Sequence, residues 1–381
     1  MDKLFDAACQ VQPPVREEQL AAIPAKRGIV LLLAEGAQPI VLLTAADLRS
    51  RVKLRLEEPL ADQRKKTADL REITREIRWR LAASHFEADL AFLQAARQLW
   101  PRTYTSLLSW KPPWFVRVQP SEEFPRLERT RSVSTSGSPA RLVGPFPGGP
   151  SADRFIEVVQ DAFDLCRDYR CLRQAPNAQP CSYGQMGKCL SPCDGRTSLE
   201  RYREVMAQAA DFAAGLRKPT LDRLRAQMRQ AAGDLQFERA GAVKSRLVRL
   251  GELNGPDYAF TAPLYDFRFI LVQRGPGRRR LRAFLAACGR IVSAGDLAYP
   301  LQGPQVEALM AKMAKLAAQP ALAAEVDEDL AGFNMGLVTH YLFSSPDRRG
   351  VIFRWTPARQ GPDLAAAIEQ AAGELHVGKK A

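Results

Sequence analysis

Long apolar runs are missing from this sequence. Although 46% of its 381 residues are hydrophobic, no run approaches the length of about 18 residues that a membrane-spanning helix needs. The first residues, MDKLFDAACQVQPP, also lack the basic segment and long apolar core of a secretory signal. We therefore expect a cytoplasmic chain without a membrane partner, long enough for two or three domains with buried cores.

Acidic residues are in the minority. There are 42 Asp and Glu residues against 55 Lys and Arg, which gives a net charge of +13. Arginine supplies most of the cations, and its planar guanidinium group suits phosphate contacts. A basic surface attracts polyanions and releases their counterions on binding. Charge alone leaves two interpretations open, a nucleic-acid-binding protein and a solvated basic surface without a partner.

Cysteine is scarce except in one segment. Five of the seven cysteines lie between Cys166 and Cys193, whereas Cys9 and Cys288 are isolated and are expected to be structural thiols. An odd total with one dense cluster argues for a metal site and against disulfides in a cytosolic chain. Thiolates bind zinc or iron–sulfur clusters, but the spacing matches neither common zinc fingers nor ferredoxins. The residues alone thus predict a metal site without identifying the metal, and buried free thiols are the alternative.

Apolar periodicity predicts an α+β fold. Two short aliphatic runs at 28–33 and 39–44 indicate a β-hairpin, and 114–118 indicates a further strand. Residues 1–23 are predicted to be an irregular leader and 131–153 a loop. Helices are predicted at 63–83, 86–100, 152–165, 199–216 and 219–253.

After residue 254 the pattern changes. Short β-type runs with turn signals fill 258–298, which indicates a small C-terminal α/β domain. The basic turn 278–282 could touch phosphate or be a solvated turn. Further elements are predicted as helices at 303–318, 321–343 and 362–375 and a strand at 350–355.

The cysteine segment carries a specific motif. Pro180 precedes Cys181, and Cys189 and Cys193 follow in a Cys-x7-Cys-x3-Cys spacing, with Phe163-Asp-Leu-Cys166 upstream. This arrangement resembles the cysteine segment of the UvrC family, a component of the bacterial ABC excinuclease. The resemblance implies a 4Fe–4S cluster, with zinc as the alternative. The implied ligands are Cys166, Cys181, Cys189 and Cys193, with Cys171 as the alternative to Cys166.

Fragments of a nuclease signature precede the cysteines. The same family begins with a GIY-YIG nuclease domain, and Gly28-Ile-Val30, Val41-Leu-Leu43, Arg51, Glu87 and the segment 101–108 follow its order. That chemistry hydrolyses phosphodiesters with a positioned water and a divalent ion. The resemblance implies that Arg51 lies near the phosphate and that Glu87 holds Mg²⁺.

The tyrosines of the two nuclease motifs are missing. Val30, Val41 and Leu42 are aliphatic and cannot hydrogen-bond a water. General acid–base help is worth about 10²–10⁴ in rate, so its loss favours a degenerate DNA-binding module over an active nuclease. The alternative roles are a helix-surface cation for Arg51 and a charge at a helix N-terminus for Glu87.

Residues 219–254 predict two antiparallel amphipathic helices joined near Gly233. Their pattern resembles the UVR motif of the same family, which docks on a matching hairpin of the excinuclease B subunit. Ordinary core packing within one domain is the alternative. The residues that the resemblance assigns to docking are Leu224, Met228, Leu235, Phe237, Glu238 and Ala240.

Four domains are predicted. They are a GIY-YIG-like domain at 20–118, a linker with the cysteine domain at 119–218, the UVR hairpin at 219–254 and the C-terminal domain at 255–381. The acidic signature and paired hairpins of the family's later nuclease and DNA-binding domains are absent from the last of these. Three hypotheses follow: a nucleotide-excision-repair protein that binds DNA and the B subunit, an active Mg²⁺-dependent endonuclease, and a metal-stabilised, catalytically inactive nucleic-acid adaptor.

Overall fold

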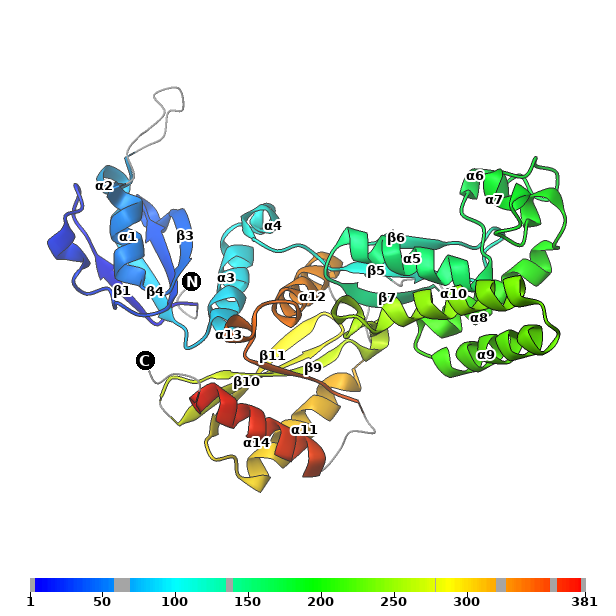
Figure 1. The fold of residues 1–381 in the computed structure, drawn as a ribbon. Coiled ribbons are helices and arrows are strands. Elements are labelled where there is room, and N and C mark those ends of the chain that lie inside the picture. The colour runs from blue at the N-terminus through cyan, green and yellow to red at the C-terminus, as the bar shows by residue number, and fades with distance from the viewer. Residues whose placement is uncertain are drawn as a thin grey trace.

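A computed structural model describes residues 4–57, 69–134, 140–277, 279–319, 327–356 and 362–377. Within these ranges the fold is α+β, as predicted, with three four-stranded antiparallel sheets and helices packed on them (Figure 1). None of the described helices combines the length and the apolar character needed to cross a bilayer.

The first sheet has the strand order β1–β4–β2–β3. Its strands are β1 (Ala7–Gln10), β2 (Gly28–Leu33), β3 (Pro39–Ala45) and β4 (Glu76–Leu81). The helices on it are α1 (Leu48–Glu57) and α3 (His85–Leu99). The β2–β3 hairpin confirms the prediction from the two aliphatic runs. Val30 packs on the α1 side and its neighbour Leu31 on the α3 side, as the period of two in a strand requires.

Two expectations for this part of the chain are wrong. The helix expected at 63–83 is only a short α2 (Leu70–Ile73) followed by strand β4, while residues 63–68 lie outside the described ranges. Ile73 and Ile77 have helical spacing, but Ile77 and Trp79 are buried between half-exposed neighbours, and this alternation decides for a strand. The expected leader instead supplies strand β1 and a helical turn, η1 (Glu17–Leu20). Its apolar side chains at Val11, Val15, Leu20 and Ile23 are buried in the α1-side core.

The second sheet has the order β6–β5–β7–β8 and lies under the middle helices. Its strands are β5 (Trp114–Val118), β6 (Leu127–Thr130), β7 (Arg141–Phe146) and β8 (Ala262–Pro263). Strand β7 falls in the stretch expected to be a loop, because Leu142, Val143 and Phe146 are buried although Gly and Pro interrupt them. The helices here are α5 (Gly149–Phe163), α6 (Tyr169–Leu172), α7 (Ser182–Gln185), α8 (Leu199–Ala213), α9 (Arg217–Gly233) and α10 (Phe237–Gly251).

The third sheet has the order β11–β10–β9–β12. Its strands are β9 (Arg268–Arg274), β10 (Arg280–Ala287), β11 (Arg290–Ala298) and β12 (Val351–Arg354). The helices α11 (Gly303–Ala317) and α14 (Pro362–Val377) lie on one face and α12 (Glu328–Leu342) on the other (Figure 1). The predicted strands and helices are thus confirmed here, except that residues 320–326 lie outside the described ranges. The short elements are α4 (Tyr104–Leu107), α13 (Pro346–Arg349), η2 (Glu35–Ala37), η3 (Pro192–Asp194), η4 (Glu252–Asn254), η5 (Pro256–Tyr258) and η6 (Leu264–Asp266).

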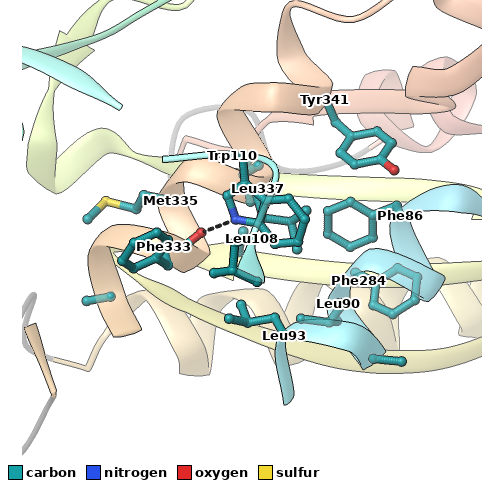
Figure 2. Packing of buried hydrophobic residues seen from close by; sticks show 14 of the residues in the cluster. Phe86, Leu90, Leu93, Leu108, Trp110, Phe284, Phe333, Met335, Leu337 and Tyr341 are labelled. Atoms are coloured by element: carbon teal, nitrogen blue, oxygen red, sulfur yellow. Dashed lines mark hydrogen bonds between the residues drawn. The ribbon is translucent and has the colours of Figure 1, made fainter. Parts of the chain in front are cut away.

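One apolar core joins the two ends of the chain. The ring centroid of Phe86 on α3 lies 5.1 Å from that of Phe284 on β10 and 5.2 Å from that of Tyr341 on α12 (Figure 2). The indole N–H of Trp110 donates to the carbonyl oxygen of Phe333 at 3.0 Å. The first and third sheets therefore stabilise one another across α3 and α12. The domain boundaries predicted from the sequence stay predictions.

A partly buried histidine, His340 on α12, lies in this interface. Burial of the His340 ring, assisted by Arg348 and opposed by Asp89, lowers its pKa below the ordinary value. The unfolded chain then binds a proton on His340 more readily than the folded chain, so the stability that neutral His340 permits is lost as pH falls below about 6.5. Burial also raises the pKa of Asp89, which accepts a hydrogen bond from the Tyr341 hydroxyl at 2.6 Å.

We expect His340→Gln to remove this acid sensitivity. The free energy of unfolding of the natural chain should fall relative to that of the variant between pH 7 and pH 5. Subtracting the two profiles removes the part of the Asp89 contribution that does not depend on His340. Urea unfolding at several pH values measures both, and parallel profiles would show that His340 does not titrate differently in the folded chain.

Candidate functional site

The cysteines lie in a compact segment at the end of the molecule away from the first sheet, around α6 and α7 (Figure 1). Helix α5 ends at Asp164, which adopts a left-handed conformation with φ of 51° and turns the chain into Cys166. The backbone N–H of Cys166 donates to the buried Tyr202 hydroxyl at 3.2 Å. Cys166, Cys189 and Cys193 are buried, whereas Cys171 and Cys181 are half-exposed.

Backbone turns bring the later cysteines back to Cys166. The N–H of Leu190 donates to the carbonyl of Asp164 at 2.8 Å, and the N–H of Ala178 donates to that of Cys193 at 2.9 Å. A Cβ on Gly184 would stand 2.7 Å from the Ser191 hydroxyl and 3.8 Å from the Cys189 sulfur. Only glycine at this position lets the two parts of the segment approach so closely.

The thiols influence one another electrostatically. Burial is the main reason that the pKa of Cys166 is raised to about 12. A backbone hydrogen bond at Asp168 opposes the rise, and the negative charges that Cys189, Cys193 and Cys181 would carry contribute to it. Burial also raises the pKa of Cys193, with Asp194 and then Cys189 and Cys181 adding to it. Like charges brought together in a desolvated site disfavour ionisation, which favours the neutral thiol at Cys166 and Cys193.

No three or more His, Cys, Asp or Glu side chains among the described residues stand in an arrangement that would hold a metal ion. The metal site, its iron–sulfur or zinc identity and its ligands therefore stay predictions. Cys171 also has a pKa raised by burial and then by Asp168, with smaller contributions from Cys181 and Cys193. Cys166 is coupled to all three motif thiols, and the choice between it and Cys171 stays open.

The positions that the nuclease resemblance compares with tyrosines hold aliphatic side chains in apolar surroundings. Val30 is fully buried between β2 and α1, and Val41 is half-buried in the same cluster. Leu42 points to the opposite, α3-side core. Arg51 is half-buried on α1, and its guanidinium makes no hydrogen bond or ion pair to another described residue.

Glu87 faces the third sheet. It is 5% exposed, and its Oε2 accepts the N–H of Ala83 at 2.8 Å while the Ser84 hydroxyl caps the Glu87 N–H at 3.1 Å. Its Oε1 pairs with Arg282 of β10, which also binds Asp296 at 2.6 Å. Sequence reasoning placed Arg282 in a basic turn, whereas it lies in strand β10, and it missed Asp296. The Ser84-x-x-Glu87 spacing is a capping-box pattern that signals a structural glutamate.

The predicted helical hairpin is confirmed. Helix α9 ends at Gly233, and α10 begins at Phe237. Leu224 at its base is 2% exposed, whereas Leu235 and Phe237 at its tip are 73% and 68% exposed. Glu238 is also exposed, and Met228 and Ala240 are half-buried.

Ion pairs hold the hairpin beside the cysteine segment. Arg246 on α10 makes two hydrogen bonds, of 2.7 and 2.9 Å, to the carboxylate of Asp164 at the end of α5. Arg249, one turn later, pairs with Asp161. The base of the hairpin is thus fixed to the residues that lead into Cys166, while its tip is free of core contacts.

Comparison with known proteins gives consistent matches. Residues 113–212 match the family model described as UvrC/Cho excinuclease, middle domain. The UvrABC system protein C of Moorella thermoacetica is 28% identical over 239 residues, which cover 62% of this chain and 38% of that protein. The protein of the same name from Ruminiclostridium cellulolyticum is 25% identical over 277 residues, covering 72% and 45%.

A further relative, the UvrABC system protein C of Desulforudis audaxviator, is 28% identical over 232 residues, which cover 60% of this chain and 36% of that protein. This chain therefore spans about two fifths of the length of the curated relatives it matches. No solved structure matches it.

Proposed function

Because this chain is a UvrC-family protein, we propose that it acts in nucleotide excision repair by binding DNA and docking the excinuclease B subunit. The observation that carries the proposal is the hairpin tip, where Leu235 and Phe237 are exposed although the base is buried. Exposed apolar side chains at a fixed helix end are typical of a surface that another helix pair covers.

We infer that the nuclease-like module binds DNA without cutting it. A water that attacks a phosphodiester needs polar partners, and the side chains at Val30 and Val41 pack in an apolar cluster instead. Both oxygens of Glu87 are already engaged, by Ala83 and Arg282. This supports a catalytically inactive adaptor over an Mg²⁺-dependent endonuclease that uses Arg51 and Glu87.

We further propose that Cys166, Cys181, Cys189 and Cys193 hold a 4Fe–4S cluster, with zinc as the alternative. This proposal is supported by the electrostatic interaction between the thiols. A cation among them would replace repulsion with attraction and favour the thiolates. The bound group would supply a structural cross-link beneath the docking hairpin.

We expect Phe237→Asp to weaken binding of the excinuclease B subunit. Loss of an exposed aromatic anchor and burial of a carboxylate should together cost about 2 kcal/mol or more, roughly a thirtyfold rise in Kd. Isothermal titration of purified B subunit measures it. Leu54→Asp is the matched control, since Leu54 is 54% exposed on α1, away from the hairpin. Unchanged affinity of the Phe237 variant would refute docking through the tip.

A further inference from the structure

A cleft with a volume of about 960 Å³ lies between the first and third sheets. One wall comes from the residues that flank β2, β3 and β4, and the other from the β9–β10 turn and the end of β11. Its described lining is Lys26, Arg27, Ala46, Leu81, Ala82, Ala83, Arg274, Gly275, Pro276, Gly277, Arg279, Arg282, Tyr299 and Leu375.

The charged side chains in this lining are all cations. Lys26 and Arg27 face the cleft from the first sheet, and Arg274, Arg279 and Arg282 face it from the third. No aspartate or glutamate belongs to the described lining. Cations gathered in one hollow raise the local potential more than the same charges spread over a convex surface.

Three of these cations are uncommitted. Among the described residues, no hydrogen bond or ion pair engages the side chains of Lys26, Arg274 or Arg279, and all three are exposed. The other two are held in place: Arg27 donates from Nη2 to Nε2 of His85 at 3.2 Å, and Arg282 binds Glu87 and Asp296. The cleft thus combines two arginines that other side chains hold in place with three cations that are available to a ligand.

A backbone hydrogen bond joins the ends of strands β9 and β10, beside two of the cations. The N–H of Gly275 donates to the carbonyl of Arg280 at 2.8 Å, and a Cβ on Gly275 would stand 2.7 Å from the Arg280 carbonyl carbon. Opposite, the N–H of Ala82 donates to the carbonyl of Arg27 at 2.9 Å. Backbone hydrogen bonds therefore fix the local backbone within each of the two cationic walls.

We infer that this cleft binds the phosphate backbone of a single-stranded nucleic acid. Grooves that take single strands combine cations along the backbone with aromatic side chains that bases contact, and Tyr299 supplies the aromatic residue here. The inference rests on the proposed function for the choice of nucleic acid among polyanions. It adds a binding site that neither the cysteine segment nor the hairpin provides.

The test is the affinity of the full chain for a labelled 15-nucleotide single-stranded DNA, measured by fluorescence anisotropy without the B subunit. Arg274→Ala with Arg279→Ala should weaken binding at least tenfold at 50 mM salt. The slope of log K against log salt should become shallower by about 1.4, from about 0.7 for each of two lost phosphate contacts.

The matched control is Arg229→Ala with Arg280→Ala, which removes the same charge from two exposed arginines outside the cleft. An equal loss in both double variants would overturn the inference and leave B-subunit docking untouched. Competition by duplex DNA or polyglutamate as strong as by the single strand would overturn the choice of ligand. Failure of the natural chain to bind any nucleic acid would sink both this inference and the DNA-binding part of the proposed function.

Discussion

Replacing Arg282 by methionine should lower the free energy of unfolding by about 2–4 kcal/mol, because the substitution leaves a buried carboxylate without its cation. Glu87 is 5% exposed and pairs with Arg282 across the junction of α3 and β10. Arg282 also neutralises Asp296 on the neighbouring strand. Methionine preserves most of the side-chain volume, so the loss reports the charge rather than a cavity.

Two comparisons make this expectation specific. Arg280→Met, two residues earlier on the same strand, changes an exposed arginine with no ion pair among the described residues and should shift stability by about 0.5 kcal/mol or less. Adding Glu87→Gln to Arg282→Met should recover part of the loss, because no unpaired buried charge then remains at that position. Urea unfolding gives all four values, and equal effects at Arg280 and Arg282 would contradict the structural role of the pair.

This pair also changes how a nuclease test must be interpreted. Glu87→Ala would remove the acceptor for Ala83 and leave Arg282 with one partner fewer, so lost DNA cleavage could follow from a loosened interface. Arg51→Ala is the cleaner probe of catalysis, since the Arg51 side chain makes no hydrogen bond or ion pair to another described residue.

Local patterns predicted most elements of the fold. The hairpin of β2 and β3, the helices α3 and α10 and the strand β12 follow from apolar periodicity and turn residues alone. One failure arose where two periods coincide: Ile73 and Ile77 fit a helix, but alternating burial across Ile77 and Trp79 fits the strand that forms. Tertiary pairing with β2 decides such a segment, and no local pattern contains it.

Some of the candidate sites can likewise be predicted from local sequence, whereas others depend on tertiary packing. The cysteine spacing and the hairpin pattern are contiguous in sequence and could be identified from it. The Glu87–Arg282 pair joins residues 195 positions apart, and the basic cleft joins Lys26 with Arg274, 248 positions later, so only the packing of the first sheet on the third creates them. The apolar filling around Val30 likewise depends on Val11 and Leu20, in a segment that composition alone marked as a leader.

Cys181→Ser should abolish the metal centre and cause the largest loss of stability of any single change considered. A structural metal site can contribute about 10 kcal/mol or more to folding, and removing a thiolate ligand forfeits much of it. We expect the natural chain, purified without oxygen, to be brown and to contain iron and acid-labile sulfide. The variant should be colourless and should largely unfold at the temperature where the natural chain is stable.

Cys288→Ser is the matched control, because Cys288 is buried outside the segment, where its thiol contacts the carbonyl of Leu264 at 3.6 Å. It should keep the colour and the iron content. A parallel pair, Cys166→Ser and Cys171→Ser, identifies the upstream ligand, since only loss of the true ligand should release the metal. One equivalent of zinc in a colourless natural chain would select the alternative metal.

The measurement also decides what the raised thiol pKa values mean. If the natural chain holds neither iron nor zinc and Cys181→Ser unfolds at the same temperature, the five cysteines are ordinary free thiols, and the segment keeps its shape through contacts such as Tyr202 to Cys166. If metal is bound, the cation must offset the burial and, to a smaller degree, the repulsion that raise the pKa of Cys166 to about 12, and loading must release protons. Proton release on reconstitution, absent in Cys181→Ser, would then show that the thiols ionise when they bind the metal. The same segment lies beside the base of the hairpin, which the Arg246–Asp164 pair fixes.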